Sequence, residues 1–559
     1  MRFLRGLGAP ARIGLTLLVA GALLLIALRL PDGGPEPIPG DRRDWFQSAC
    51  DLPLELLERI ERGHLDGPAP DVQIVPREPH LFGARGSFKL TGHTGPWDYL
   101  ARVPLLLYGP GFIAPNGLIA SDPPATLADY APTIGELIGH RFDPPGGGRV
   151  ITEALLPAGE RNGVPRVVVT IVWDGGGWNV LNLWPDAWPT LARLMEEGTT
   201  IRNATIGSSP SVTPSIHANI GTGTFPNRHG ITQIPIRIDG KIIDSWQDTS
   251  PQYLLTPTLA DEFDVATDNE SLVGYFGYRA WHLGLMGHGA YSAGGDKDMA
   301  VLVDEEGGFF TNPDYYSMPA YANDIGGLER FLTAADLEDG TLDQTWGDRP
   351  VLGDPKARQW TPAWSMYQRK IIRRLLDQEG FGKDEIPDLF FTNYKHIDQV
   401  GHYFNRVSPQ MEVTLRHSDD ALADLVEYLN RAVGENRWVV GLTADHGQGY
   451  KAQEKDAWAI SDKELVEDVA AHFDVPGELF VQAMRPSGFW LDYDAMAEFG
   501  ITDEEVARYV LHYELGQNVQ DGKKMPGFYE GRENERLFAT AFLSDDLDEI
   551  MECARKRQS

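Results

Sequence analysis

Three short polar segments of the chain contain residues that could bind metal ions. They are Asp398 and His402 in "DQVGH", Asp445 and His446 in "ADHG", and Asp174 after the apolar run "VVVTIV". Carboxylates and imidazoles are the oxygen and nitrogen ligands that zinc takes in proteins. Each segment alone has an ordinary explanation, because an acid after a strand often caps a helix and Asp-His-Gly often forms a turn. Their occurrence in one chain favours a metal centre.

A further polar segment is "PSVTPSIHANIGTGTFPNRHGI", where Thr213 opens a predicted helix. A threonine before proline is usually a helix cap. The start of a helix also carries the positive end of the helix dipole, which favours an alkoxide and a phosphate group. Metal coordination lowers the pKa of such a hydroxyl. By itself the segment leaves Thr213 open as a helix cap or as a reactive hydroxyl.

A lone histidine, His93, lies in the Gly-flanked stretch "KLTGHTGPWDY", residues 89–99. The next run, "ARVPLLLYGPGF", is typical of a strand followed by a Pro-Gly turn. Taken by itself, His93 is explained as a turn residue that hydrogen-bonds the backbone.

The elements that would position these residues alternate between strands and helices. Buried strands are predicted at 164–174, 386–393 and 436–443, each followed by polar residues, and a long helix is predicted from about 412 to 432. This pattern predicts an α/β fold with a mostly parallel sheet and a site along one sheet edge. Residues 235–365 are rich in Gly, Asp and aromatic residues, lack long periodic runs, and are predicted to form an inserted cap over the site.

Composition and the N-terminal segment indicate the compartment. The 559 residues carry a net charge of −32, which excludes a basic nucleic-acid-binding surface. Residues 13–28 are uncharged and follow three arginines, so we expect an uncleaved signal anchor with a cytoplasmic N-terminus and an extracellular catalytic domain; a cleaved signal and a secreted protein are the alternative. The only two cysteines, Cys50 and Cys553, then favour a disulfide, against two free thiols.

The motifs together resemble the alkaline phosphatase superfamily, in its nucleotide pyrophosphatase and phosphodiesterase branch. The resemblance covers most of 164–450 and rests on the threonine segment, on "DQVGH" and on "TADHG". It implies an alkaline-phosphatase-like sheet flanked by helices, and hydrolysis of phosphodiester or pyrophosphate bonds through a phospho-threonine. It also implies two zinc ions, with manganese possible. The implied ligands are Asp398, His402 and His93 for one ion, and Asp174, Asp445, His446 and the Thr213 oxygen for the other.

The order of the motifs departs from that family. Its last histidine normally follows the other ligands, in a Gly-x-His-Gly loop before a strand and a helix. Here "TGHTGPWDYLARVPLLLYGPGFIAP" and "TLADYAPTIGELIGH" have that character but precede the first strand. The resemblance therefore implies a circular permutation, which would make His93 a ligand.

The implied domain plan has an anchor and linker at 1–43 and one catalytic domain at 44–559. Within the domain we expect a permuted C-terminal segment at 44–160, a core with the cap at 161–450, and a small subdomain with a C-terminal helix at 451–559. Cys50 would open one helix and Cys553 would close another, so that a disulfide joins the ends at the cut. By the chain-entropy model such a bond contributes roughly 5 kcal/mol as an upper value.

Two residues that contact the phosphoryl group in the family are replaced in this sequence. The family's asparagine 21 residues after the nucleophile is replaced by Ile234, with Gln233 beside it as a substitute. The first residue of a Lys-x-Arg pair found in monoesterases is replaced by Gly277, and Arg279 remains as a candidate phosphate contact. Lys395, shortly before Asp398, is a further candidate.

Several other functions compete with diester hydrolysis as interpretations of this sequence. A sulfatase needs a Cys or Ser in a motif that "TPSI" lacks, and the related phosphoglycerate mutases are cytosolic. A phosphomonoesterase of the same fold stays open, as does a metal-bound module that binds a phosphorylated envelope polymer without turnover. The predicted partners are a phosphorylated small molecule or envelope polymer and, through the N-terminal helix, a membrane.

Overall fold

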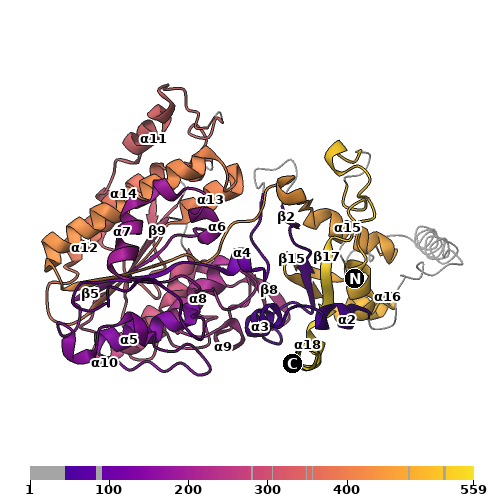
Figure 1. Ribbon diagram of the computed structural model, residues 1–559, viewed down its shortest axis with the longest axis horizontal. Coiled ribbons are helices and arrows are strands. Elements are labelled where there is room, and N and C mark those ends of the chain that lie inside the picture. The colour runs from indigo at the N-terminus through magenta and orange to yellow at the C-terminus, as the bar shows by residue number, and fades with distance from the viewer. Residues whose placement is uncertain are drawn as a thin grey trace, which may run out of the picture.

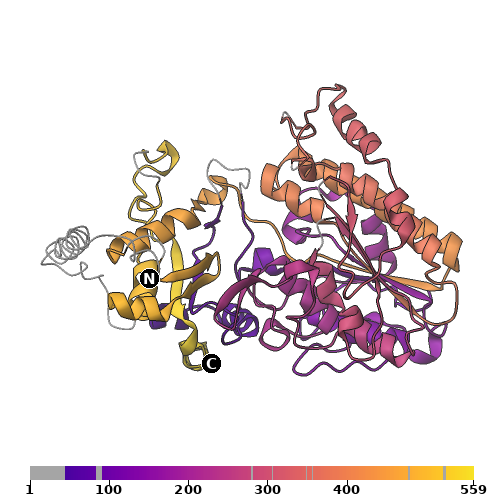
Figure 2. The same cartoon turned by 180° about the vertical axis from the view of Figure 1, so that it is seen from behind.

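The computed structural model describes residues 44–83, 91–278, 281–304, 306–347, 349–355, 357–475, 479–519 and 524–558. These residues form two bodies that lie side by side (Figure 1). The larger body is built on a nine-stranded sheet and the smaller one on a four-stranded sheet. The view from behind in Figure 2 shows the same division.

The nine-stranded sheet is mixed, with a parallel centre. Its order is β11-β10-β9-β12-β5-β13-β3-β6-β4, and the five strands from β10 to β13 in this order run parallel to one another. β3 pairs antiparallel with both β13 and β6. The strand bounds are β3 Leu105–Tyr108, β4 Gly117–Ile119, β5 Val167–Val172, β6 Thr199–Ile201, β9 Val273–Tyr278, β10 Met299–Val303, β11 Phe309–Phe310, β12 Asp388–Asn393 and β13 Trp438–Thr443.

Helices cover both faces of this sheet, which explains why its central strands are continuous apolar runs. One apolar core joins the sheet to helices that lie above it in Figure 1, and a second core joins it to helices below. The helices above are α7 Pro189–Glu197, α11 Leu328–Asp336, α12 Ala363–Glu379, α13 Lys395–Phe404 and α14 Pro409–Leu429. Those below include α5 Tyr130–Ile138, α8 Thr213–Thr222 and α10 Leu259–Ala266. The predicted α/β fold with helices around a mostly parallel sheet is confirmed.

The interpretation of 235–365 as a cap insertion needs correction. β9 and β10 belong to the central sheet, and α10 packs in the core beneath it. The β7–β8 hairpin (Pro235–Ile238 and Lys241–Asp244) forms a separate two-stranded sheet. β9 was missed because its sequence "VGYFGY" contains two glycines, which usually indicate loops rather than buried strands.

The smaller body is assembled from both ends of the described chain. Its sheet has the order β15-β16-β1-β17, with β1 paired to β16 and to β17. The strands are β1 Val72–Pro76, β15 Val481–Arg485, β16 Gly488–Leu491 and β17 Phe538–Leu543. The helices around it include α2 Asp44–Cys50, α3 Leu54–Gly63, α15 Asp462–His472, α16 Tyr493–Phe499, α17 Asp503–Leu511 and α18 Leu547–Gln558. The small subdomain predicted at 451–559 therefore also contains residues 44–82.

The predicted disulfide is present. Cys50 and Cys553 are bonded, with their Cα atoms 5.7 Å apart. The predicted helix boundaries were wrong, because Pro53 separates two helices: Cys50 ends α2, and α3 begins at Leu54. Cys553 lies inside α18 rather than at its end. The ends of the described part of the chain are thus neighbours, as a permuted fold requires, but the permutation itself stays a prediction.

The predicted anchor and linker at 1–43 lie outside the described residues. Within the part of the chain that is described, no helix combines the length and apolarity needed to cross a bilayer.

Candidate active site

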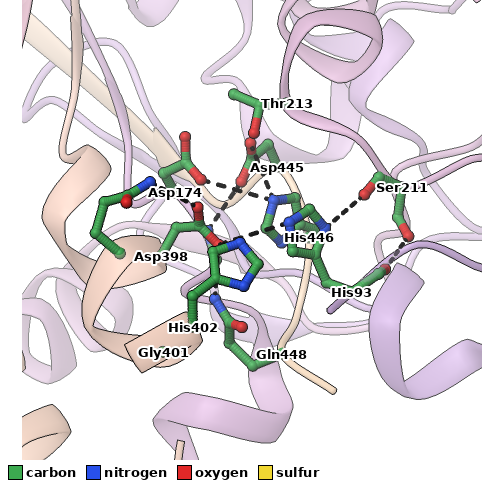
Figure 3. A network of polar contacts seen from close by, with 12 residues as sticks. His93, Asp174, Ser211, Thr213, Asp398, Gly401, His402, Asp445, His446 and Gln448 are labelled. Atoms are coloured by element: carbon green, nitrogen blue, oxygen red, sulfur yellow. Dashed lines mark hydrogen bonds and ion pairs between the residues drawn. The ribbon is translucent and has the colours of Figure 1, made fainter. Parts of the chain in front are cut away.

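The candidate ligands meet at the carboxyl ends of the parallel strands. Asp174 follows β5, Asp398 and His402 lie on α13 directly after β12, and Asp445 and His446 follow β13. Because neighbouring parallel strands end at the same sheet edge, these residues come together although they are far apart in sequence. Figure 3 shows them around one centre.

The first ligand cluster contains His93, Asp398 and His402, which have ligand atoms close enough to share one ion. The Nε2 atoms of His93 and His402 lie 3.6 and 3.3 Å from Oδ1 of Asp398. The Nδ1 atom of His93 donates to the Ser211 carbonyl at 2.8 Å, and that of His402 donates to the Thr91 carbonyl at 2.6 Å. These bonds assign the ring proton to Nδ1, so the Nε2 lone pair of each ring is directed toward Asp398, as metal binding would require.

The second cluster contains Asp174, Asp445 and His446. Nε2 of His446 lies 3.6 Å from Asp174 and 3.5 Å from Oδ2 of Asp445. Its Nδ1 donates to the Gly447 carbonyl at 2.9 Å, so Nε2 again faces the carboxylates. Asp445 is held by the backbone N–H of Gly175, which donates to its Oδ1 at 2.9 Å. The two clusters are adjacent, since the rings of His93 and His446 stack at 3.6 Å.

Lys395 lies between the two clusters and beside the candidate nucleophile. Its Nζ donates to Thr213 Oγ1 at 3.0 Å and to Asp174 at 3.0 Å, and it pairs with Asp398 at 2.9 Å. Thr213 is the first residue of α8, as the sequence predicted. The structure thus brings together all seven residues predicted as metal ligands, including the candidate nucleophile Thr213, with a buried ammonium group among them.

Burial dominates the electrostatics of the site. It raises the pKa of Asp174 well above its usual value, and it raises the pKa of Asp445 to about 7. Burial would also raise the pKa of Asp398, but the charges of His402 and Lys395 hold it well below its usual value. Burial lowers the pKa of His446 to about 4, so its ring is neutral and able to bind a metal at neutral pH.

The residues present fit metal ions. Oδ2 of Asp445 and Nε2 of His446 are buried, and neither has a hydrogen-bond partner. Buried polar atoms of this kind are costly unless something binds them. A cation between them would satisfy both, and the mixed imidazole and carboxylate donors suit zinc.

A glycine allows the two clusters to approach. Gly175 has φ of +74°, and a Cβ atom there would lie 2.3 Å from Nε2 of Gln448 and 3.1 Å from Cα of Asp398. Gln448 in turn donates to Oδ1 of Asp398 at 3.0 Å. A side chain at 175 would therefore push apart the segments that carry Asp174 and Asp398.

The three predicted substrate contacts, Arg279, Gln233 and Lys395, differ in what the structure shows of them. Arg279 lies outside the described residues. Gln233 lines the cavity, but its amide is already used: Nε2 donates to Ser487 Oγ at 2.9 Å and Oε1 accepts from the Ile234 N–H at 2.9 Å. Lys395 contacts the candidate nucleophile directly, with its Nζ 3.0 Å from Thr213 Oγ1.

A cavity of about 560 Å³ opens over the site, and both bodies line it. Thr213, Lys395 and the first ligand cluster form part of its lining. Arg485 and Pro486 of the smaller body line it as well, as do Trp246 and His282 of the larger one. The cavity can accommodate a group much larger than orthophosphate, since ligand sites typically measure about 300–1,000 Å³.

Comparison with known proteins identifies the family. Residues 168–522, more than half of the chain, match the family described as Type I phosphodiesterase / nucleotide pyrophosphatase. The chain belongs to this family. The predicted membership of the alkaline phosphatase superfamily and its phosphodiesterase branch is confirmed, and the chain is an enzyme of this class.

Relatives and a solved structure agree with this assignment. The chain is 23% identical over 426 residues to alkaline phosphatase PafA of Elizabethkingia meningoseptica, covering 65% of this chain and 76% of the relative. It is 23% identical over 331 residues to alkaline phosphatase PhoV of Synechococcus elongatus, covering 51% of this chain and 59% of the relative. The crystal structure of wild-type PafA resembles the present fold with a TM-score of 0.51 and 22% identity, covering 62% of this chain and 76% of that one.

Sequence reasoning missed several residues of the site. His282 is buried beside Thr213 and Lys395 in the cavity wall, and its ring packs on that of His217 with centroids 4.3 Å apart. Asn393, at the end of β12, donates to Asp174 at 2.9 Å and to His217 at 2.8 Å. Both lie outside the quoted motifs, and only the position of Asn393 at a strand end could have suggested a role.

Proposed function

We propose that this enzyme hydrolyses phosphate esters, namely phosphodiester or pyrophosphate bonds, through a phospho-threonine on Thr213. The observation that carries the proposal is the position of the Thr213 hydroxyl. It lies at the start of α8, 3.0 Å from the Lys395 ammonium, which in turn contacts Asp174 of one candidate ligand cluster and Asp398 of the other. Family membership supports the same class of reaction.

The first step would be attack of Thr213 Oγ1 on phosphorus. The bond from phosphorus to the leaving oxygen breaks as the bond to Thr213 forms; the threonine proton passes to solvent, and the leaving oxygen takes up a proton from solvent and departs as an alcohol or phosphate. Lys395 and the N-terminus of α8 would offset negative charge on the phosphoryl oxygens. In the second step water attacks the phospho-threonine, releases phosphate or its monoester, and restores the hydroxyl.

Two metal ions, zinc or manganese, would be held by residues of the two clusters. His93, Asp398 and His402 would bind one ion, and Asp174, Asp445, His446 and Thr213 would bind the other. When bound, the pair would supply charge that lowers the pKa of the Thr213 hydroxyl and stabilises the attacking and leaving oxygens.

One observation favours monoester hydrolysis as a second candidate. A monoester dianion carries more negative charge on its phosphoryl oxygens than a diester, and a buried lysine next to the nucleophile would bind that additional charge. The loss of the family's Lys at position 277 argued against this activity. Lys395, from a different position in the chain, places an ammonium group beside Thr213.

We place the reaction outside the cytoplasm. The Cys50–Cys553 disulfide supports this location, because disulfides persist in oxidising compartments. The high negative charge speaks against a nucleic-acid substrate. A phosphorylated small molecule or envelope polymer would fit the cavity, and membrane attachment through residues 1–43 stays a prediction.

The test is turnover by the purified metal-loaded protein. Bis(4-nitrophenyl) phosphate reports diester hydrolysis, and 4-nitrophenyl phosphate reports monoester hydrolysis. A higher kcat/KM for the diester supports the first candidate, and the reverse supports the second. If neither ester is hydrolysed by metal-loaded protein, the third possibility, a binding module without turnover, replaces both.

A further inference from the structure

A second cluster of acidic side chains lies away from the candidate active site. Asp264 of α10 and Asp296 and Asp298, in the loop before β10, place carboxylate oxygens within 4.8 Å of one another. Asp264 and Asp298 are buried, with 3% and 7% of their surfaces exposed. Asp296 is exposed and closes the cluster on the solvent side.

Nothing in the described part of the protein neutralises these carboxylates. None of the three forms an ion pair there, and the side-chain donor directed at them in the described residues is the Tyr275 hydroxyl, which faces Asp298. Lys297, between two of them in sequence, donates instead to the Pro313 carbonyl at 2.6 Å. The neighbouring Asp261, by contrast, is paired with His288 at 2.5 Å. Burial of like charges without a partner costs free energy and raises the pKa of Asp264 to about 7 and that of Asp298 well above its usual value.

A buried phenol faces the same cluster. Tyr275 of β9 has no exposed surface, and its hydroxyl makes no hydrogen bond of standard geometry. The hydroxyl is directed toward Asp298, and after burial the charge of that carboxylate is the largest influence that raises the pKa of Tyr275. The cluster therefore combines three carboxylates and one buried hydroxyl, and its carboxylate oxygens are close enough together to contact one cation.

The cluster is distinct from the candidate active site. β10 runs parallel to β9, β12 and β5, and its first residue, Met299, is level with Gly274 and Phe390. Asp298 therefore lies at the amino ends of the parallel strands. Asp174 follows the carboxyl end of β5, about five residues further along, which corresponds to roughly 15 Å at the rise of a strand.

We propose that Asp264, Asp296 and Asp298 bind a structural calcium ion. The donors are oxygen atoms only, from three carboxylates with the Tyr275 hydroxyl beside them, which suits a hard cation rather than zinc. The ion joins α10 to the loop before β10. The same loop follows His282 in sequence, and His282 lines the active-site cavity. An ion at the acidic cluster would therefore hold the chain in place just after this part of the cavity wall.

Thermal unfolding of the zinc-saturated protein tests the proposal. The zinc-saturated buffer keeps the active site filled, so added Ca²⁺ reports on the acidic cluster. We expect the unfolding midpoint to rise with Ca²⁺ concentration through the millimolar range, the affinity typical of extracellular calcium sites, at roughly 0.1–1 mM. The isosteric changes Asp264→Asn and Asp298→Asn should each abolish this rise.

Glu270→Gln is the matched control, because it removes an exposed acid just after α10 and should leave the calcium response intact. In calcium-free buffer the two asparagine variants should be at least as stable as the parent protein, since each removes like-charge repulsion. A parent protein with no response to Ca²⁺, or a response that persists in both asparagine variants, would overturn the proposal. Either result would assign the cluster to shared protons and would leave the proposed catalytic function untouched.

Discussion

At the residue scale, Thr213 makes the most direct prediction. Thr213→Ala removes the attacking oxygen, so turnover of the better nitrophenyl ester should fall by several orders of magnitude. Thr213→Ser keeps the hydroxyl and should retain much more activity. Metal analysis of both variants is the control, because the carboxylate and imidazole ligands remain. Near-normal turnover by the alanine variant would exclude Thr213 as the nucleophile.

His93 is the ligand whose position in the chain is least expected. It precedes Asp398 by some 300 residues, yet its Nε2 points at that carboxylate from 3.6 Å. His93→Ala should therefore remove about one equivalent of zinc per chain, measured by elemental analysis after dialysis. His80→Ala is a suitable control, since His80 is also buried but contacts Glu535 in the smaller body. If the His93 variant retains two zinc ions per chain, His93 is a turn residue and not a ligand.

His282 is predicted to contact the substrate. It lines the cavity with Thr213 and Lys395, and Nε2 of its ring is buried without a hydrogen-bond partner. A hydrogen bond to a charged phosphoryl group contributes about 1.5–3 kcal/mol. His282→Ala should thus weaken inhibition by inorganic phosphate about 10- to 100-fold with zinc content unchanged, and His282→Gln should recover part of the loss. Unchanged phosphate inhibition in the alanine variant would remove His282 from the substrate site.

The site residues differ in how far sequence could predict them. Asp174, Asp398, His402, Asp445 and His446 sit in motifs with recognisable spacing. His93 became a ligand candidate only through the resemblance to a family. His282, Asn393 and Gln448 have no local pattern, because their roles depend on which distant segments the fold brings to them.

At the element scale, the close approach of β5 and α13 depends on Gly175. Gly175→Ala adds strain at φ of +74° and a Cβ atom in contact with Asp398 and Gln448. Gly163→Ala is the matched control, since Gly163 also has positive φ, +84°, but nothing lies within 4 Å of its Cβ position. Strain alone costs about 1–3 kcal/mol. Both variants should unfold earlier in urea, and only the Gly175 variant should also lose zinc.

A Gly175→Ala protein that binds zinc normally would show that the two clusters tolerate a small separation. The elements of the fold differ in how clearly the sequence indicates them. β5, β12 and β13 are long β-branched or aromatic runs, and α14 is a periodic helix, so their types followed from sequence. β9 was hidden by glycines, and the split between α2 and α3 was missed although Pro53 indicates it.

At the scale of the whole molecule, the active-site cavity depends on how the two bodies are joined. The β7–β8 hairpin of the larger body contacts the smaller body through Arg237, whose guanidinium binds both oxygens of Asp71 at 2.8 and 2.6 Å. Gln233 adds its hydrogen bond to Ser487. Such contacts join segments far apart in sequence, so neither the composition of the smaller body nor its position could be predicted from local patterns.

The disulfide fastens the smaller body at the place where its two chain ends meet. Cys50 of α2 and Cys553 of α18 close a loop of 503 residues, and β1 and β17 pair directly beside them. Without the bond, the helices at both ends could separate from the sheet independently. Removing a native disulfide typically costs about 2–5 kcal/mol, in part because the unfolded chain gains freedom.

The paired change Cys50→Ser with Cys553→Ser should therefore lower the free energy of unfolding of the smaller body by an amount in that range. Zinc content should stay at the parent value, because the predicted ligands belong to the strand ends of the larger body and to the loop at His93. KM should rise more than kcat falls, since Arg485 and Pro486 in the cavity wall belong to the loosened body. Urea unfolding, elemental analysis and steady-state kinetics on the same preparation separate these effects. Loss of zinc together with stability would instead show that the two bodies unfold as one unit, and unchanged stability would show that the β1–β17 pairing holds the ends together without the bond.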